Sequence, residues 1–209
     1  MEKYYTCAEL LGKNPFIPIV ILDDITKAVP LAQSLIAGGI NIMEVTLRTK
    51  NALAIIETIT SEVPDMVVGA GTVLGTDQYH LGVKHGAKFI VAPGLTNNLI
   101  EVSHDYDVPF LPGAVTPTEI MCALEHGFNY LKFFPAENYS GVATLRAFSS
   151  VFNQVKFCPT GGITLENAKN YLNLENVLSV GCSFLAQDTL IRNCNFAAIT
   201  EIAVKTRLI

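Results

Sequence analysis

The stretch "IMEVTLRTKNALAIIETITSE", residues 42 to 62, joins the two patterns that decide the fold. Its first part, "IMEVTL" at 42–47, is a short run of apolar and β-branched residues, which is typical of a buried strand. Its second part, 51–62, has helical character. A strand followed by a helix is the repeating unit of proteins in which helices cover a parallel sheet.

The same unit recurs along the whole chain, with strand starts about 20 to 26 residues apart. The predicted strands are 16–22, 42–47, 66–72, 88–94, 108–114, 130–135, 155–162 and 176–183. The predicted helices are 27–38, 51–62, 76–86, 97–105, 117–126, 141–150, 164–173 and 195–207, with an extra one at 5–12. Thr76, Thr116 and Thr164 are the predicted helix caps.

Eight such units predict an α/β fold, namely a closed (β/α)₈ TIM barrel with an extra N-terminal helix. A doubly wound open sheet, which commonly has five or six strands, is the alternative. The chain has 209 residues, half of them hydrophobic, and no Pro/Gly/Ser-rich linker divides it. We therefore expect residues 1–209 to form one domain.

Composition argues against several classes of function. The net charge is −5 and no dense Lys/Arg cluster is present, so nucleic acid is not an expected partner. The longest apolar runs are too short to cross a bilayer, and "MEKYYTCAEL" at the start does not resemble a signal peptide. The five widely spaced cysteines fit reduced thiols, which predicts a cytoplasmic protein.

A metal site is not predicted either. The four histidines all fall in predicted helices, and no two of them are spaced i,i+4.

Polar side chains interrupt the apolar strands near their carboxyl ends, which form the active face of a barrel. Because side chains alternate between the two faces of a strand, Glu44 and Arg48 share a face that would point into the barrel. We expect them to meet Thr72, Lys132 and Thr160 at the barrel mouth. The alternative is a buried Glu44–Lys132 salt bridge that only supports the core, at a heavy desolvation cost.

These residue types suggest chemistry on a keto acid. Burial and a nearby arginine disfavour the charged form of Lys132, and a neutral amine can attack a ketone to form a Schiff base. The protonated imine then accepts the electrons of a breaking C–C bond. Glu44 would move protons, Arg48 would bind a carboxylate through its forked guanidinium, and Thr72 would orient that carboxylate.

A second group of residues suggests phosphate binding. "PTGGIT" at 159–164 follows the seventh strand, and "GCS" at 181–183 ends the eighth. The loops after these two strands often bind phosphate in barrels, so Gly161, Gly162 and Ser183 are the candidates.

Five segments carry a resemblance to a known family: "MEVTLRT", "GAGTVL", "APGLT", "LKFFPAE" and "PTGGI". The chain resembles the class I 2-keto-3-deoxy-6-phosphogluconate (KDPG) aldolases, also called 4-hydroxy-2-oxoglutarate (KHG) aldolases. The resemblance implies a (β/α)₈ barrel, a homotrimer, and no metal or other cofactor. It also implies a small-molecule keto-acid substrate, the phosphorylated acid, which is cleaved to pyruvate and glyceraldehyde 3-phosphate.

By position, the family's Schiff-base lysine matches Lys132 and its general acid/base matches Glu44. The pyruvate carboxylate would contact Arg48 and Thr72, and a threonine that helps govern stereochemistry matches Thr160. The family's phosphate contacts match Gly161, Gly162 and Ser183. Two departures are Cys182, where the family often has glycine, and Ala92, where it usually has serine before Pro-Gly.

Other substrates and functions are also compatible with these residues. Within the class, the galactonate epimer and unphosphorylated 4-hydroxy-2-oxoglutarate compete as substrates. Outside it stand a non-catalytic sugar-phosphate-binding barrel and a metal-dependent aldolase, which would lose activity to a chelator.

Overall fold

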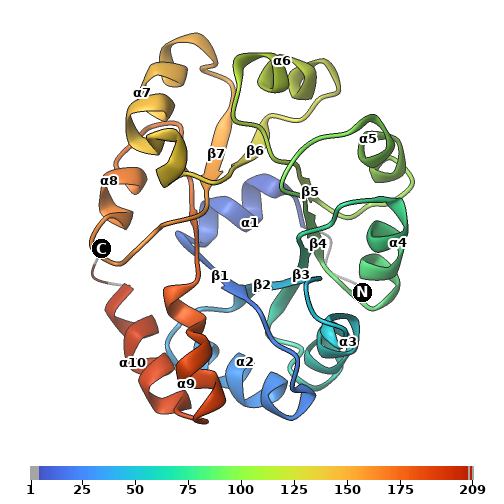
Figure 1. The fold of residues 1–209 in the computed structure, drawn as a ribbon, viewed down its shortest axis with the longest axis vertical. Coiled ribbons are helices and arrows are strands. Elements are labelled where there is room, and N and C mark those ends of the chain that lie inside the picture. The colour runs from blue at the N-terminus through green and yellow to red at the C-terminus, as the bar shows by residue number, and fades with distance from the viewer. Residues whose placement is uncertain (1–4, 207, 209) are drawn as a thin grey trace.

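All eight predicted strands form in the computed structural model, which describes residues 5–206 and residue 208. Six strands pair in the order β5-β4-β3-β2-β1-β8, and β6 pairs with β7. Every one of these pairs is parallel. The result is an α/β fold in which a curled parallel sheet is surrounded by helices (Figure 1). The sequential strand order differs from the doubly wound alternative, in which the order reverses within the sheet.

The strands are shorter than the sequence predicts, mostly at their carboxyl ends, where the chain turns toward the next helix. Their bounds are β1 Phe16–Val20, β2 Ile42–Thr46, β3 Val67–Gly71, β4 Phe89–Val91, β5 Phe110–Leu111, β6 Tyr130–Phe133, β7 Lys156–Pro159 and β8 Val180–Cys182.

Isolated bridges join the six-stranded and two-stranded sheets. Gly113 pairs with Lys132 of β6, and the Lys132 N–H donates to the Pro112 carbonyl at 2.8 Å. On the other side of the β6–β7 pair, Thr160, which follows β7, pairs with Gly181 of β8. Backbone pairing therefore continues past both edges of the β6–β7 sheet.

Most predicted helices are found within a residue or two of their expected ends. The helices are α1 Cys7–Lys13, α2 Ala28–Ala37, α3 Ala52–Glu62, α4 Thr76–Lys84, α5 Asn97–Ser103, α6 Pro117–Glu125, α7 Gly141–Val151, α8 Ala168–Leu172, α9 Asp188–Arg192 and α10 Phe196–Thr206, with 3₁₀ turns η1 Ile25–Lys27, η2 Glu137–Tyr139 and η3 Phe184–Ala186. Arg207, the last residue of the predicted helix 195–207, lies outside the described residues.

The predicted caps have different outcomes. The Thr116 cap is confirmed, and Glu119 completes a capping box there. The Thr76 cap is wrong, because Thr76 is the first residue of α4 and Gly75 is its cap. The Thr164 cap is also wrong: Thr164 and Asn167 bond each other's backbone N–H groups in a turn, at 2.8 and 3.3 Å, so α8 begins only at Ala168.

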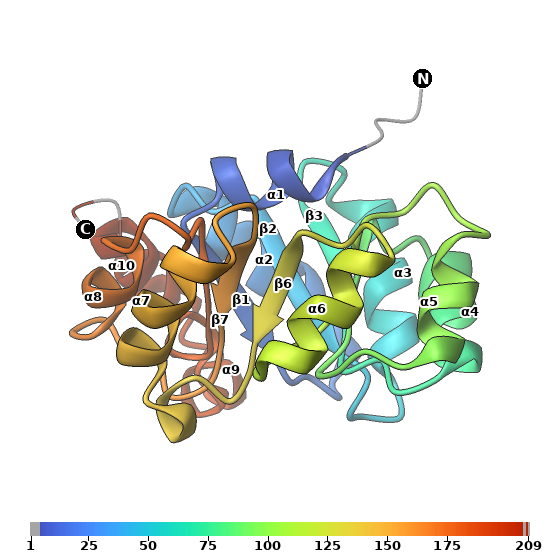
Figure 2. The ribbon, with the colours of Figure 1, turned by 90° about the horizontal axis from the view of Figure 1, so that it is seen from above.

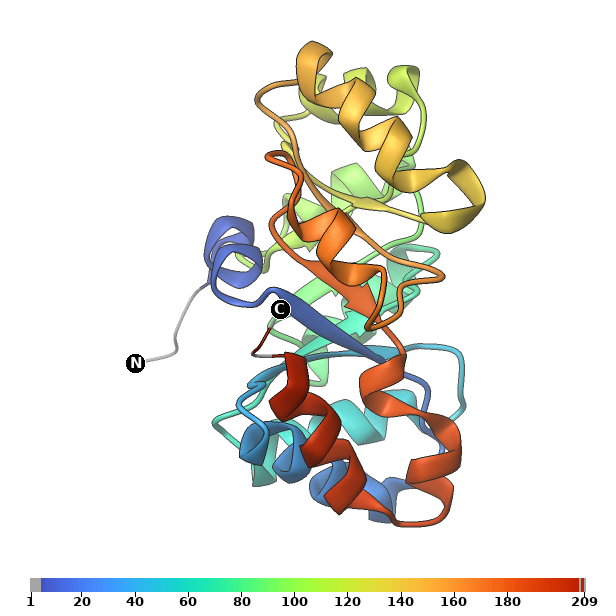
Figure 3. The same ribbon diagram turned by 90° about the vertical axis from the view of Figure 1, so that its left-hand side faces the viewer.

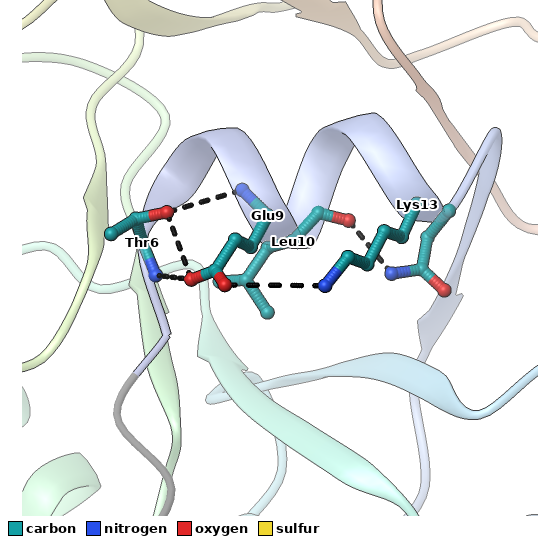
Figure 4. A network of polar contacts seen from close by, with 5 residues as sticks. Thr6, Glu9, Leu10 and Lys13 are labelled. Carbon is teal, nitrogen blue, oxygen red and sulfur yellow. Dashed lines mark hydrogen bonds and ion pairs between the residues drawn. The ribbon is translucent and has the colours of Figure 1, made fainter.

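The extra N-terminal helix is α1, and it crosses the amino ends of the strands (Figure 2). In side view it stands apart from the helices on the outside of the sheet (Figure 3). A capping box between Thr6 and Glu9 starts this helix (Figure 4). Leu10 and Leu11 are buried, and the Cys7 thiol donates to the Phe110 carbonyl at 3.4 Å. Because α1 covers the amino ends of the strands, a small molecule would reach the space inside the curled sheet from the carboxyl ends.

The core lies between the sheet and its helices. On β2, Met43 and Val45 are fully buried, together with Leu35 of α2 and Ile55 and Ile59 of α3. Among residues 5–206 and 208, none of the helices combines the length and the apolar character needed to traverse a bilayer.

Candidate active site

Lys132 and Glu44 form a buried pair inside the curled sheet. Lys132 Nζ lies 3.2 Å from Glu44 Oε1, within both hydrogen-bond and ion-pair range. The two residues are only 5% and 3% exposed. They are 88 positions apart in sequence, on β6 and β2, so only the folding of the sheet brings them together.

The neighbouring strand β3 makes room for the carboxylate. Gly71 on β3 pairs with Thr46 of β2. A Cβ atom at Gly71 would collide with the side chain of Glu44, at its carboxylate and at Cγ. The absence of a side chain at this position therefore lets Glu44 reach Lys132.

Arg48 and Thr72 follow β2 and β3 and lie at the rim of the site. Arg48 Nε donates a hydrogen bond to Thr72 Oγ1 at 3.3 Å. Thr72 has a φ of 58°, in the left-handed region that a β-branched residue rarely adopts. Such an outlier costs on the order of 1–3 kcal/mol and tends to occur at ligand sites. This conformation turns the chain directly after β3.

The residues that follow β7 and β8 lie on the opposite side. Thr160 is buried, and its hydroxyl occupies space that a Cβ atom on Gly181 would fill. Gly161 and Gly162 have φ values of 101° and 78°, which glycine adopts without strain. Ser183 is exposed and precedes η3.

One cavity of about 200 Å³ gathers all eight predicted site residues. The structure thus brings together both predicted groups, the one around Lys132 and the one after the last two strands. The other residues of the wall were not predicted as site residues, although strand-end position was an available signal for most of them, and alternation along the strand already places Phe134 on the same side as Lys132. Those residues are Ile19, Ile21, Pro93, Phe134, Ile163 and Gly181.

Phe134 stands out among them, because its ring centroid lies 5.6 Å from Lys132 Nζ. At that distance the ring face attracts a cation, and it also restricts water near the amine.

The cysteines near the site are inert by environment. Burial raises the pKa of the Cys158 thiol, and this effect outweighs the opposing influence of the Lys132 charge. Cys182, one of the two departures from the family, is buried, and its Sγ lies 3.9 Å from the Ile17 carbonyl. Its side chain thus packs toward β1. Within residues 5–206 and 208, no three His, Cys, Asp or Glu side chains are grouped to hold a metal ion.

The fold and the site together define the class: an α/β carbon–carbon lyase of the aldolase kind. The chain belongs to the KDPG and KHG aldolase family, whose model matches residues 7–202.

Similar proteins cover nearly the whole chain. A 2-dehydro-3-deoxy-phosphogluconate aldolase of Dickeya dadantii is 40% identical over 97% of this chain and 96% of its own length. A KHG/KDPG aldolase of Escherichia coli K12 has the same identity and coverage. Among solved structures, a KDPG aldolase from Legionella pneumophila, with pyruvate captured as a covalent carbinolamine intermediate, has a TM-score of 0.94 at 40% identity and covers 96% of this chain and 97% of its own.

Proposed function

We propose that this protein is a class I aldolase that reversibly cleaves 2-dehydro-3-deoxy-6-phosphogluconate to pyruvate and glyceraldehyde 3-phosphate. The observation that carries the proposal is the buried amine of Lys132, 3.2 Å from the Glu44 carboxylate, on the wall of a cavity open to substrate. Membership of the KDPG and KHG aldolase family supports the same reaction.

In the mechanism, Lys132 Nζ attacks the C2 ketone and forms a carbinolamine. A proton from the Glu44 carboxyl group lets the carbinolamine hydroxyl leave as water, which gives a protonated Schiff base and the Glu44 carboxylate. The C4 hydroxyl then gives up its proton while the C3–C4 bond breaks. The electron pair of that bond moves to the imine and leaves an enamine, and the aldehyde departs. Protonation at C3 and addition of water release pyruvate and restore the amine.

Glu44 is the proton carrier in this scheme. Its carboxylate takes the C4 hydroxyl proton and returns a proton to C3 of the enamine. Contact with Lys132 supports the assignment, because a general base has to lie within hydrogen-bond reach of the reacting groups.

Arg48 and Thr72 hold the carboxylate of the keto acid. The guanidinium forms a bidentate pair with a carboxylate, and its bond to Thr72 orients it beforehand. Thr160, buried across the cavity, contacts the reacting carbons and influences which face of the enamine meets the aldehyde.

The phosphate end of the substrate lies against Gly161, Gly162 and Ser183. The two glycines let the backbone approach phosphate oxygens closely, and the exposed serine hydroxyl donates to them. Unphosphorylated 4-hydroxy-2-oxoglutarate, which yields pyruvate and glyoxylate, is a second proposed substrate. The same lysine, glutamate and arginine serve it without the phosphate contacts.

We also propose that the eight strands close into a (β/α)₈ barrel that starts with the extra helix α1, as one domain over residues 1–209. The bridges at both edges of the β6–β7 pair support closure. A homotrimer is proposed from the family resemblance, and exposed apolar side chains such as Leu74 and Met121 supply surface for it. Five free thiols support a cytoplasmic location.

Reductive trapping tests the mechanism. Borohydride added in the presence of pyruvate should leave a covalent adduct on Lys132, detected by mass spectrometry of the digested protein. The Lys132→Ala variant should give no adduct and no turnover. Lys156, on β7 and partly exposed, is the matched control: Lys156→Ala should keep the adduct and the activity. The absence of an adduct at every lysine of the wild type would contradict the Schiff-base mechanism.

A further inference from the structure

A hydrogen bond between Tyr171 and Glu137 lies outside the cavity wall. Tyr171 of α8 is fully buried, and its hydroxyl donates to Glu137 Oε1 of η2. A Cβ atom on Gly141, at the start of α7, would collide with this hydroxyl. The hydroxyl is therefore confined between η2 and α7 and has little freedom to turn elsewhere.

Glu137 is also in direct contact with the loop proposed to bind phosphate. Its backbone N–H donates to the Gly161 carbonyl at 3.1 Å. Its Cβ and Cγ atoms lie where a Cβ atom on Gly162 would project. The adjacent Ala136 N–H donates to the Thr160 carbonyl at 2.8 Å. Residues 136–137 thus support the loop along three consecutive residues.

Helix α8 holds the same loop from its other side. Asn167, the N-cap of α8, donates from Nδ2 to the Gly162 carbonyl at 3.0 Å. Tyr171 is four residues further on, where a helical turn brings a side chain back to the same face. Helix α8 and its N-cap therefore hold both Gly162, through Asn167, and Glu137, through Tyr171.

We propose that Tyr171 is a positioning residue for phosphate: through Glu137 it holds the Gly161–Gly162 backbone in the conformation that accepts the substrate phosphate. This inference depends on the proposed function. Burial raises the pKa of the Tyr171 hydroxyl, and its bond to Glu137 raises it further, so the hydroxyl remains a donor across the working pH range.

The Tyr171→Phe variant tests the proposal, because it removes only the hydroxyl. We expect KM for 2-dehydro-3-deoxy-6-phosphogluconate to rise about 5-fold with kcat near the wild-type value, which is the scale of one lost hydrogen bond. The inhibition constant of inorganic phosphate should rise in parallel. For 4-hydroxy-2-oxoglutarate, which has no phosphate, both kinetic constants should stay within about 2-fold.

A matched control is available in Tyr79, which is also fully buried and whose hydroxyl has no hydrogen-bond partner among the described residues. Tyr79→Phe should leave kcat and KM unchanged for both substrates. Glu137→Gln retains an acceptor and should resemble the wild type, whereas Glu137→Leu should reproduce the selective rise in KM even if Tyr171→Phe does not fold.

Equal losses for the two substrates, or an unchanged phosphate inhibition constant, would overturn the inference. Trapping with pyruvate separates this failure from failure of the proposed function. If the wild type forms the adduct and the Tyr171 and Glu137 variants show no selective effect, only the positioning role is wrong. If the wild type forms no adduct, the aldolase mechanism itself is wrong.

Discussion

At the scale of single residues, the site depends on how two buried charged groups are kept together. An isolated buried charge is costly, and a buried pair offsets that cost only with good geometry. For Lys132 and Glu44, that geometry is provided by a residue without a side chain, Gly71 on the adjacent strand. The geometry of the reactive pair thus depends on the lack of a side chain at Gly71.

Gly71→Ala should therefore move the Glu44 carboxylate away from Lys132. We expect kcat to fall by about 100-fold or more, the lower end of what a positioned general acid or base contributes. Overpacking should also lower stability by about 1–3 kcal/mol. Gly75→Ala is the control, because a Cβ atom there meets nothing within 4 Å and the φ of −168° suits any residue. Equal activity of the two variants would show that Glu44 tolerates displacement.

At the scale of elements, local side-chain bonds decide where helices begin. The capping box at Thr116 and Glu119 starts α6 where the sequence predicts it. The same residue type at Thr164 instead closes a turn with Asn167, which delays α8 and leaves the Gly161–Gly162 loop longer than expected. Residue type alone does not distinguish the two outcomes, because both use a threonine hydroxyl that accepts from a backbone N–H.

The α6 capping box predicts a pH dependence of stability. Partial burial raises the pKa of Glu119, but hydrogen bonds from the Val115 and Thr116 N–H groups more than offset this, and the pKa lies below its ordinary value. A group with a lowered folded-state pKa stabilises above its unfolded pKa and loses that contribution as pH falls through the folded-state value.

Glu119→Gln should accordingly be less stable than wild type at neutral pH, by about 0.5 kcal/mol for a partly exposed carboxylate at a helix start. The difference should shrink as pH falls below 4.5. Thermal melts across this range measure it, with Glu125→Gln at the other end of α6 as the comparison. A stability difference that is the same at both ends of the pH range would assign the effect to packing.

At the scale of the whole molecule, strands distant in sequence are brought together so that their ends line the cavity of the site. Proposed closure of the barrel and the single-domain organisation predict one cooperative unfolding transition. Far-UV circular dichroism and tyrosine fluorescence should give coincident urea unfolding curves. Tyrosine fluorescence can be used because the chain has seven tyrosines and no tryptophan. For a trimer, the midpoint should rise with protein concentration. Two resolved transitions would contradict a single domain.

The sequence predicts the residues of the site better than the contacts that support them from outside the cavity. Alternation along two strands places Glu44 and Lys132 on interior faces, and both lie there. Tyr171 could not be found in the same way, since it sits in a predicted helix and its partner Glu137 is 34 positions away. Short-range patterns report burial and period; they carry no signal for a pairwise contact between distant elements.

By itself, the sequence determined the alternation of eight strands with helices, the family and the types of reactive residue, because periodicity and residue chemistry are local properties. Only the tertiary structure decided that Lys132 and Glu44 lie 3.2 Å apart, that Arg48 meets Thr72, and that the loop after β7 is supported from both η2 and α8. The physical reason is that these contacts depend on the parallel register of the strands and on space left by particular glycines, and both exist only once the chain has packed.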